Sequence, residues 1–235
     1  MIIYLPLKEV NIWGWTKPLT SLQDLNSAIS KSGQPFGVDQ SGPACEFRAD
    51  WPCDKTMYQM MGISAHNGID IPCANGTKVH ASTDGTVVEV SNDVSAGLGV
   101  VIWDKSQKCK TVYWHNKENL VSLNQVVKRG EVIAYADNTG YSKGNHLHFM
   151  LKETDEVGNT VNKDNGYFGA IDPIPHIRFE NSMSETLVKA RQVCEGYLDP
   201  AGQIYWADKD EKSYWIARLQ DKIRQLQEVL SELQK

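Results

Sequence analysis

Gly144-Asn145-His146-Leu147-His148-Phe149 carries two histidines on either side of a leucine. Alternate residues of a β-strand point to the same face, so His146 and His148 project together while Leu147 enters the opposite layer. Two imidazoles side by side on one face of a sheet can share a metal ion. The stretch therefore predicts a strand with one apolar face in a core and one polar face at a metal site.

The segment His66-Asn67-Gly68-Ile69-Asp70 supplies a third histidine and a carboxylate. Four fully extended residues span roughly 13 Å, which is too far for two groups that share one ion. The chain must therefore bend at Gly68, and glycine permits such a bend.

His115 closes the β-type run from Lys110 to Trp114. Strand alternation predicts that His115 shares a face with Tyr113 and that Trp114 points the other way. His80 and His176 fit no such pattern and are interpreted as ordinary structural histidines.

Five side chains thus compete for three ligand positions: His66, Asp70, His115, His146 and His148. Two histidines and one carboxylate with an open fourth position are typical of catalytic zinc. The remaining two side chains can then move protons or stabilise an oxyanion. The residues by themselves do not say which two.

The pattern of apolar and turn residues along the sequence indicates three regions. Residues 1–51 are uneven and read as an N-terminal arm, with one helix expected over Ser21–Ser30 and Ser21 as its cap. Residues 52–178 carry short β-type runs separated by turn residues, which indicates an antiparallel, mainly β domain. Residues 179–235 form a helical tail.

The tail carries a heptad seam of apolar residues spaced by three and four. Its members are Ile216, Leu219, Ile223, Leu226, Leu230 and Leu233. The seam predicts a homo-oligomer or a virion partner through a coiled coil. Fewer than three heptads is short, so an amphipathic helix packed on its own domain is the alternative.

Composition narrows the class of protein. Hydrophobic residues make up 41% and charged residues 23% of the 235 residues, which is ordinary for a globular protein. The formal charge of −5 gives no reason to expect a nucleic-acid partner. No window reaches the roughly 18 apolar residues of a membrane span, and Lys8 and Glu9 interrupt any signal peptide.

The five cysteines are an odd number without a C-x-x-C pair, so no disulfide framework or thiolate zinc site is indicated. Cys45 and Cys53 are close enough to pair in an oxidising compartment. Two free thiols are the reading that the sequence favours.

From about Gln34 to Pro173, roughly three-fifths of the chain, the sequence resembles the lysostaphin-type, or LytM-like, zinc metallopeptidases that cut bacterial cell-wall peptides. The resemblance rests on Ala65–Asp70, Gly76–Val79, Asp84–Val87, Tyr113–His115, Val127–Gly130, Asn138–Gly140 and Gly144–Phe149, in the family's order. It implies a barrel-sandwich-hybrid-like metallopeptidase domain.

Carried over residue by residue, the resemblance implies that His66, Asp70 and His148 bind one zinc ion per chain. His115 and His146 would be the catalytic histidines. None of the five is substituted, whereas some relatives lose ligands and survive as regulators or binding modules. The sequence departs from the family pattern at Ala65, Asn145 and Met150. These departures concern loop shape or substrate fit and remove no donor atom.

The expected function is a metalloendopeptidase that hydrolyses an amide in bacterial peptidoglycan. Without a signal peptide it would be a phage lysin, carried in the virion or released at lysis, and would act at the cell wall. The alternative is a virion tail or envelope assembly component that binds the wall without cutting it. A lipoyl-like carrier domain is disfavoured because no modifiable lysine stands in an apolar hairpin tip.

Two further questions concern the N-terminal arm and the tryptophans. Asn11, Asn26 or Asp39 would be the oxygen ligand if the arm covers the metal, as in some relatives. Trp13, Trp15 and Trp51 are more simply explained by packing than by contact with the wall polymer.

Overall fold

The computed structural model describes residues 1–179 and, further along, residues 217, 220, 221, 223 and 224. Met1–Phe179 form one compact unit. Of the six seam residues between Ile216 and Leu233, only Ile223 lies within the described residues, and its side chain is half exposed. The coiled coil therefore stays a prediction.

The elements of the unit are, in chain order, β1 (Ile3–Tyr4), β2 (Glu9–Ile12), β3 (Trp15–Pro18), α1 (Leu22–Ser32), the 3-10 helix η1 (Ala44–Glu46), α2 (Met57–Met61), β4 (Ile69–Pro72), β5 (Lys78–His80), β6 (Gly85–Asp93), β7 (Gly97–Asp104), β8 (Cys109–Asn119), β9 (Val126–Val127), β10 (Val132–Ala136), β11 (His146–Glu153), β12 (Ala170–Ile171), the 3-10 helix η2 (Ile174–His176) and β13 (Ile177–Arg178).

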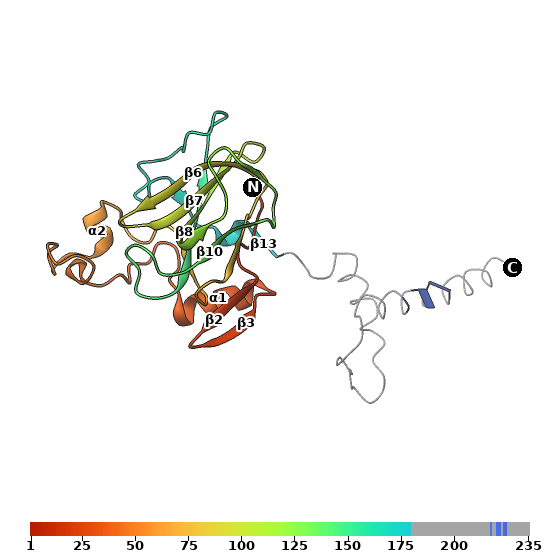
Figure 1. Cartoon of the computed structure of the whole chain (residues 1–235), viewed down its shortest axis with the longest axis horizontal. Coiled ribbons are helices and arrows are strands. Elements are labelled where there is room, and N and C mark those ends of the chain that lie inside the picture. The colour runs from red at the N-terminus through yellow and green to blue at the C-terminus, as the bar shows by residue number, and fades with distance from the viewer. Residues whose placement is uncertain (180–216, 218–219, 222, 225–235) are drawn as a thin grey trace. The chain divides into compact units, whose positions relative to one another are not determined.

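Nine strands form one antiparallel sheet, seen as the central group of arrows in Figure 1. Its order is β12-β11-β8-β7-β6-β9, with β4 also paired to β11 and β10 paired to both β8 and β5. The mainly β, antiparallel prediction is confirmed. Two small sheets accompany it: the β2–β3 hairpin, and the parallel pair β1–β13, in which Ile3 lies opposite Ile177.

The core follows the alternation of β4 and β11. Ile69 and Ile71 of β4 and Leu147 and Phe149 of β11 are fully buried in the main hydrophobic core. Full burial of an aliphatic or aromatic side chain of this size stabilises a fold by about 1.5–3 kcal/mol. The residues between them, including Asp70, are consequently turned to the other face of these strands.

Helix α1 forms where the sequence predicts a helix. The Ser21 hydroxyl accepts a hydrogen bond from the Asp24 amide (3.1 Å), and the buried residues Leu25, Ala28 and Ile29 follow helical spacing. At the C-cap, a Cβ on Gly33 would lie 2.1 Å from the carbonyl oxygen of Asp70. Only glycine therefore lets α1 end directly against β4.

None of the helices in the described part of the chain is long and apolar enough to cross a membrane.

Candidate metal and active site

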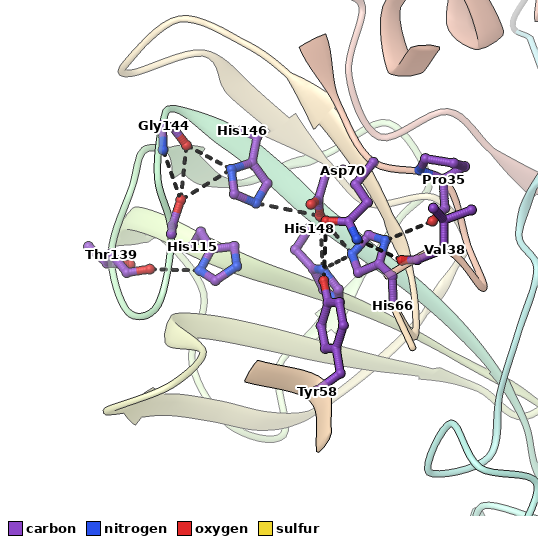
Figure 2. Close-up of polar contacts among 12 residues, drawn as sticks. Pro35, Val38, Tyr58, His66, Asp70, His115, Thr139, Gly144, His146 and His148 are labelled. Atoms are coloured by element: carbon purple, nitrogen blue, oxygen red, sulfur yellow. Dashed lines mark hydrogen bonds and ion pairs between the residues drawn. The ribbon is translucent and has the colours of Figure 1, made fainter. Parts of the chain in front are cut away.

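A cavity of about 710 Å³ contains all five side chains that the sequence singles out. They reach it from four places along the chain: His66 from the loop before β4, Asp70 from β4, His115 from β8, and His146 and His148 from β11. Figure 2 shows these side chains turned toward one another.

Three of the five meet at one point. Asp70 Oδ1 lies 3.0 Å from His66 Nε2 and 2.9 Å from His148 Nδ1. The two histidine nitrogens lie 2.9 Å from each other. These are the three side chains in the described part of the chain that group closely enough to hold a metal ion. His146 Nε2 lies next to the group, 3.4 Å from the same Asp70 oxygen.

The segment before α2 holds His66 and Asp70 through its backbone. His66 Nδ1 lies 3.0 Å from the carbonyl oxygen of Pro35, and the amide of Gly37 donates to the carbonyl of His66 (2.8 Å). The amide of Asp70 donates to the carbonyl of Gln34 (2.8 Å). Because a carbonyl only accepts, His66 carries a proton on Nδ1, and Nε2 is the nitrogen that faces the other two donor atoms.

The bend predicted at Gly68 is present, but its reason is space rather than a left-handed backbone. A Cβ at Gly68 would lie 2.8 Å from His148 Nε2 and 2.7 Å from the carbonyl oxygen of Phe149. Glycine therefore allows the bent segment to pass directly over the ring of His148.

The prediction for the faces of β8 is wrong. Tyr113 lies in the core, Trp114 stacks on His148 with ring centroids 5.4 Å apart, and His115 faces His146 with centroids 4.7 Å apart. His115 has a φ of 65°, and the pairing with β7 gains one residue at this place. Such a β-bulge breaks alternation, so Trp114 and His115 both line the cavity.

His115 and His146 are held in the same tautomer. His115 Nδ1 donates to the carbonyl of Thr139 (2.6 Å), and His146 Nδ1 donates to the carbonyl of Gly144 (2.7 Å). The other nitrogen of each ring, Nε2, is then an acceptor. Both rings are oriented by loop backbone on the side opposite to Asp70 (Figure 2).

The surroundings set the charges of the group. Burial lowers the pKa of His148 to about 4 and that of His115 to about 3, so both rings are neutral near pH 7. Burial also opposes a charge on His66, but the Asp70 carboxylate outweighs it and raises the pKa of His66. Burial opposes ionisation of Asp70 too, and the rings of His146 and His66 nevertheless hold its pKa well below the ordinary value.

The donor set fits a zinc ion. Zinc binds imidazole nitrogen and carboxylate oxygen at about 2.0–2.2 Å. In a triangle with sides of 2.9, 2.9 and 3.0 Å, each corner lies about 1.7 Å from the centre, so points at zinc-binding distance from all three atoms exist just off its plane. An ionised carboxylate beside imidazoles is also the right chemistry.

Phe47, one of the residues that line the cavity, comes from a loop that a disulfide closes. Cys45 and Cys53 form this bond, so the preference for free thiols is wrong at these positions. Residues 45 and 53 are brought together because the 3-10 helix at Ala44–Glu46 and the turns after it fold the loop back on itself. Cys73 and Cys109 are buried free thiols.

The aromatic residues of the disulfide-closed loop pack against Tyr141, whereas two other tryptophans are exposed. Trp51 lies edge-on to Tyr141 with ring centroids 5.5 Å apart, and Phe47 lies 6.2 Å from the same ring. Trp13 and Trp15 are 77% and 82% exposed, so packing does not explain them. The interpretation of the tryptophans as packing residues is right for Trp51 and wrong for these two.

The oxygen ligands considered in the N-terminal arm and the two remaining histidines have local structural contacts. Asn11 Oδ1 accepts from the amide of Gly14, and Asp39 Oδ1 accepts from Ser41, so both oxygens serve local turns. His80 and His176 contact the backbone carbonyls of Gly130 and Met1 and are not among the residues that line the cavity.

Sequence reasoning missed three contributors to the site. Trp114 lines the cavity because of the bulge, and Gln34 and Tyr58 line it beside His66, where the Tyr58 hydroxyl donates to Gln34 Oε1 (3.3 Å). The resemblance to the metallopeptidases begins at Gln34, which is the one signal that marks the supporting segment. The bulge has no comparable signal.

The site's segments coincide with a known domain. Residues 64–163 match Peptidase family M23, and this range includes all five cavity residues singled out above. The chain carries an M23 peptidase domain. The resemblance to lysostaphin-type peptidases is thereby confirmed.

The M23 domain is similar to proteins of different function. Peptidoglycan DD-endopeptidase ShyB of Vibrio cholerae is 31% identical over 142 residues, which cover 54% of this chain and 33% of ShyB. Murein hydrolase activator NlpD of Salmonella dublin is 32% identical over 139 residues, which cover 58% of this chain and 34% of NlpD. The match thus spans about a third of each of these relatives.

Among solved structures, the catalytic domain of the antimicrobial peptidase lysostaphin from Staphylococcus simulans is 26% identical, with a TM-score of 0.44. The likeness covers 67% of this chain and 97% of that domain.

Proposed function

We propose that this chain is a zinc-dependent endopeptidase that hydrolyses an amide bond in peptidoglycan stem peptides or cross-bridges. The observation that carries the proposal is the convergence of three donor atoms within 3.0 Å of one another, with His115 and His146 beside them in one cavity. ShyB, an endopeptidase of peptidoglycan, supports the choice of substrate.

His66, Asp70 and His148 would hold one zinc ion per chain. When bound, zinc supplies a Lewis acid that polarises an amide carbonyl and makes water nucleophilic near neutral pH. His66 is held for this task by Pro35, and His148 by the ring of Trp114 stacked at an angle of 16°.

His115 and His146 would be the catalytic histidines. In the neutral form of each ring the unprotonated nitrogen is Nε2, because Nδ1 donates to a backbone carbonyl. Such a nitrogen accepts a proton from the attacking water and returns it to the leaving amine. While it holds the proton, the ring adds a positive charge that stabilises the oxyanion of the tetrahedral intermediate.

The alternative is a protein that binds the wall or activates a separate hydrolase, as the name of the relative NlpD indicates for that protein. A binding role, whether in an envelope machine or in a virion tail, does not require all five side chains. Their joint presence in one cavity favours hydrolysis.

Mass spectrometry of the soluble products released from purified sacculi tests the proposal. The zinc-loaded protein should release fragments cut at one defined amide, and removal of the metal with a chelator should stop the release until zinc returns. His146→Gln should lose release by at least about a hundredfold, because a general base contributes roughly 10²–10⁴-fold. His176→Gln, a histidine outside the cavity, is the matched control.

Two results would contradict hydrolysis by this chain. One is unchanged release by His146→Gln. The other is release only when a separate wall hydrolase is added, which would assign the activator role instead.

A further inference from the structure

The β2–β3 hairpin presents two exposed tryptophans at the edge of the unit, where Figure 1 shows it as a red ribbon beside α1. Trp13 and Gly14 form its two-residue turn, since Ile12 and Trp15 pair on either side of them. An exposed tryptophan alone needs no special explanation. The backbone of Trp13 does need one.

Trp13 occupies a position that does not suit its side chain. Its φ is 52° and that of Gly14 is 87°, and positive φ at both central residues is the requirement of a type I′ turn. Asparagine is favoured at the first of these positions, and a bulky residue there is strained. Asn11 fixes the turn nonetheless, because its Oδ1 accepts from the Gly14 amide (3.0 Å) and its Nδ2 donates to Thr16 Oγ1 (3.3 Å).

Trp13 also belongs to the cavity that holds the candidate metal site, whereas Trp15 is not among the lining residues. The side chains that the β2–β3 hairpin itself adds to the lining, Asn11 and Trp13, carry an amide and an indole but no charge. Neither packing nor turn chemistry explains a tryptophan here, so the explanation left is a ligand.

We propose that Trp13 is a stacking platform for the neutral, N-acetylated sugar chain of the wall polymer, at the end of the cavity formed by the β2–β3 hairpin. The choice of polymer rests on the proposed function. A sugar ring offers a flat apolar face and a rim of hydroxyl and amide groups, which match an indole beside an uncharged amide. Stem peptides carry free carboxylates and amines, for which the lining side chains of the hairpin, Asn11 and Trp13, offer no charged partner.

Calorimetric titration of the whole chain with a hexamer of β-1,4-linked N-acetylglucosamine tests the proposal without any cleavage. Trp13→Asn should weaken binding roughly tenfold, which is about 1.4 kcal/mol, because the variant loses the flat indole face on which the sugar stacks. Trp15→Thr removes an equally exposed indole outside the cavity and should leave binding within about twofold.

The Trp13→Asn variant also controls for folding. Asparagine suits the left-handed turn, so the melting temperature should stay the same or rise. A weakened affinity at undiminished stability would then be a property of the indole and not of a damaged hairpin.

Three results would overturn the proposal: equal affinities of the three proteins for the hexamer, a loss of affinity for a free stem peptide in place of the sugar, or a concentration-dependent dimer that Trp13→Asn abolishes. The first includes the case of no binding at all. Failure of wall hydrolysis is a separate matter, because a protein that binds the hexamer through Trp13 and releases no fragments contradicts only the proposed function.

Discussion

The lining of the cavity is built by two different means. β4 and β11 are regular paired strands in which His148 lies directly opposite Asp70, and we call this part the strand side. We call the rest the loop side: it comprises a loop from Gln34 to Val38, the disulfide-closed loop that carries Phe47, and a bulge in β8, and backbone contacts hold these parts. The strand side positions side chains by alternation, and the loop side positions them by contacts between segments distant in sequence.

Substitutions in the two parts should therefore have different effects on stability and activity. A substitution that changes a donor atom on the strand side should leave the fold intact, because the apolar residues on the opposite face of each strand anchor that strand in the core. A change on the loop side acts through the backbone, so stability and activity should fall together.

The largest effect is expected for Asp70→Asn on the strand side. The substitution keeps the shape of the side chain and the backbone bond from the Asp70 amide to Gln34, but it removes the charge that three histidines face. We expect at least a thousandfold loss of wall hydrolysis, by an order-of-magnitude estimate of about 4 kcal/mol, and loss of the bound zinc. Product release and metal content per chain are the measurements.

Asp155→Asn is the matched control, since Asp155 accepts hydrogen bonds only within its own turn among the contacts described. It should keep zinc and activity. Full zinc occupancy in Asp70→Asn would remove Asp70 from the ligand set.

On the loop side, Gly33→Ala should destabilise the fold and impair the site together. The new Cβ would lie 2.1 Å from the carbonyl oxygen of Asp70, a backbone atom that cannot move without displacing β4. Overpacking of this kind costs roughly 2–4 kcal/mol, which urea denaturation measures. Gly144→Ala is the control, because its Cβ would meet nothing within 4 Å. Equal stability of both variants would mean that α1 does not support β4.

The strand side was largely predictable from the sequence, and the reason is physical. Period-2 alternation is a local property, so His146-Leu147-His148 alone indicates two rings on one face and a core residue on the other. The need for a bend at Gly68 followed from chain length, although the sequence could not show that the ring of His148 occupies the space of its missing side chain.

The loop side was not predictable because its determinants are not local. A bulge depends on how β7 and β8 pair, and nothing in Tyr113-Trp114-His115 marks the residue that takes a φ of 65°. Cys45 and Cys53 carry no spacing signal that separates a disulfide from two thiols. The exposure of Trp13 depends on a turn whose sequence, Trp-Gly, is not a usual one for that geometry.

Loss of the disulfide should lower the free energy of unfolding by less than Gly33→Ala does, and it should affect the loop side alone. A cross-link that closes a loop of eight residues' separation stabilises by about 2–3 kcal/mol in the chain-entropy account. We expect the double variant Cys45→Ser, Cys53→Ser to lose about that much in urea denaturation and to bind zinc normally. A reductant should destabilise the wild type to the same extent and leave the double variant unaffected. If the reductant also destabilised the double variant, its effect would come from a group other than this disulfide.

The smallest effect is expected at the start of α1, the helix that links the loop side to β4. Hydrogen bonds to the Asp24 carboxylate from Lys17, then Ser21 and Thr20, hold the pKa of that carboxyl below its ordinary value. Because its pKa is lower in the folded than in the unfolded chain, its stabilisation is fully present above about pH 4 and is lost as the pH falls further.

Asp24→Asn should therefore cost about 0.5–1 kcal/mol at pH 7, and the gap to the wild type should close toward pH 2. Asp50→Asn is the control, since the Asp50 carboxylate is 65% exposed and its pair with Arg48 should give no measurable gap at either pH. A gap for Asp24→Asn that is equal at both pH values would show that the side chain's shape, and not its charge, holds the first turn of α1.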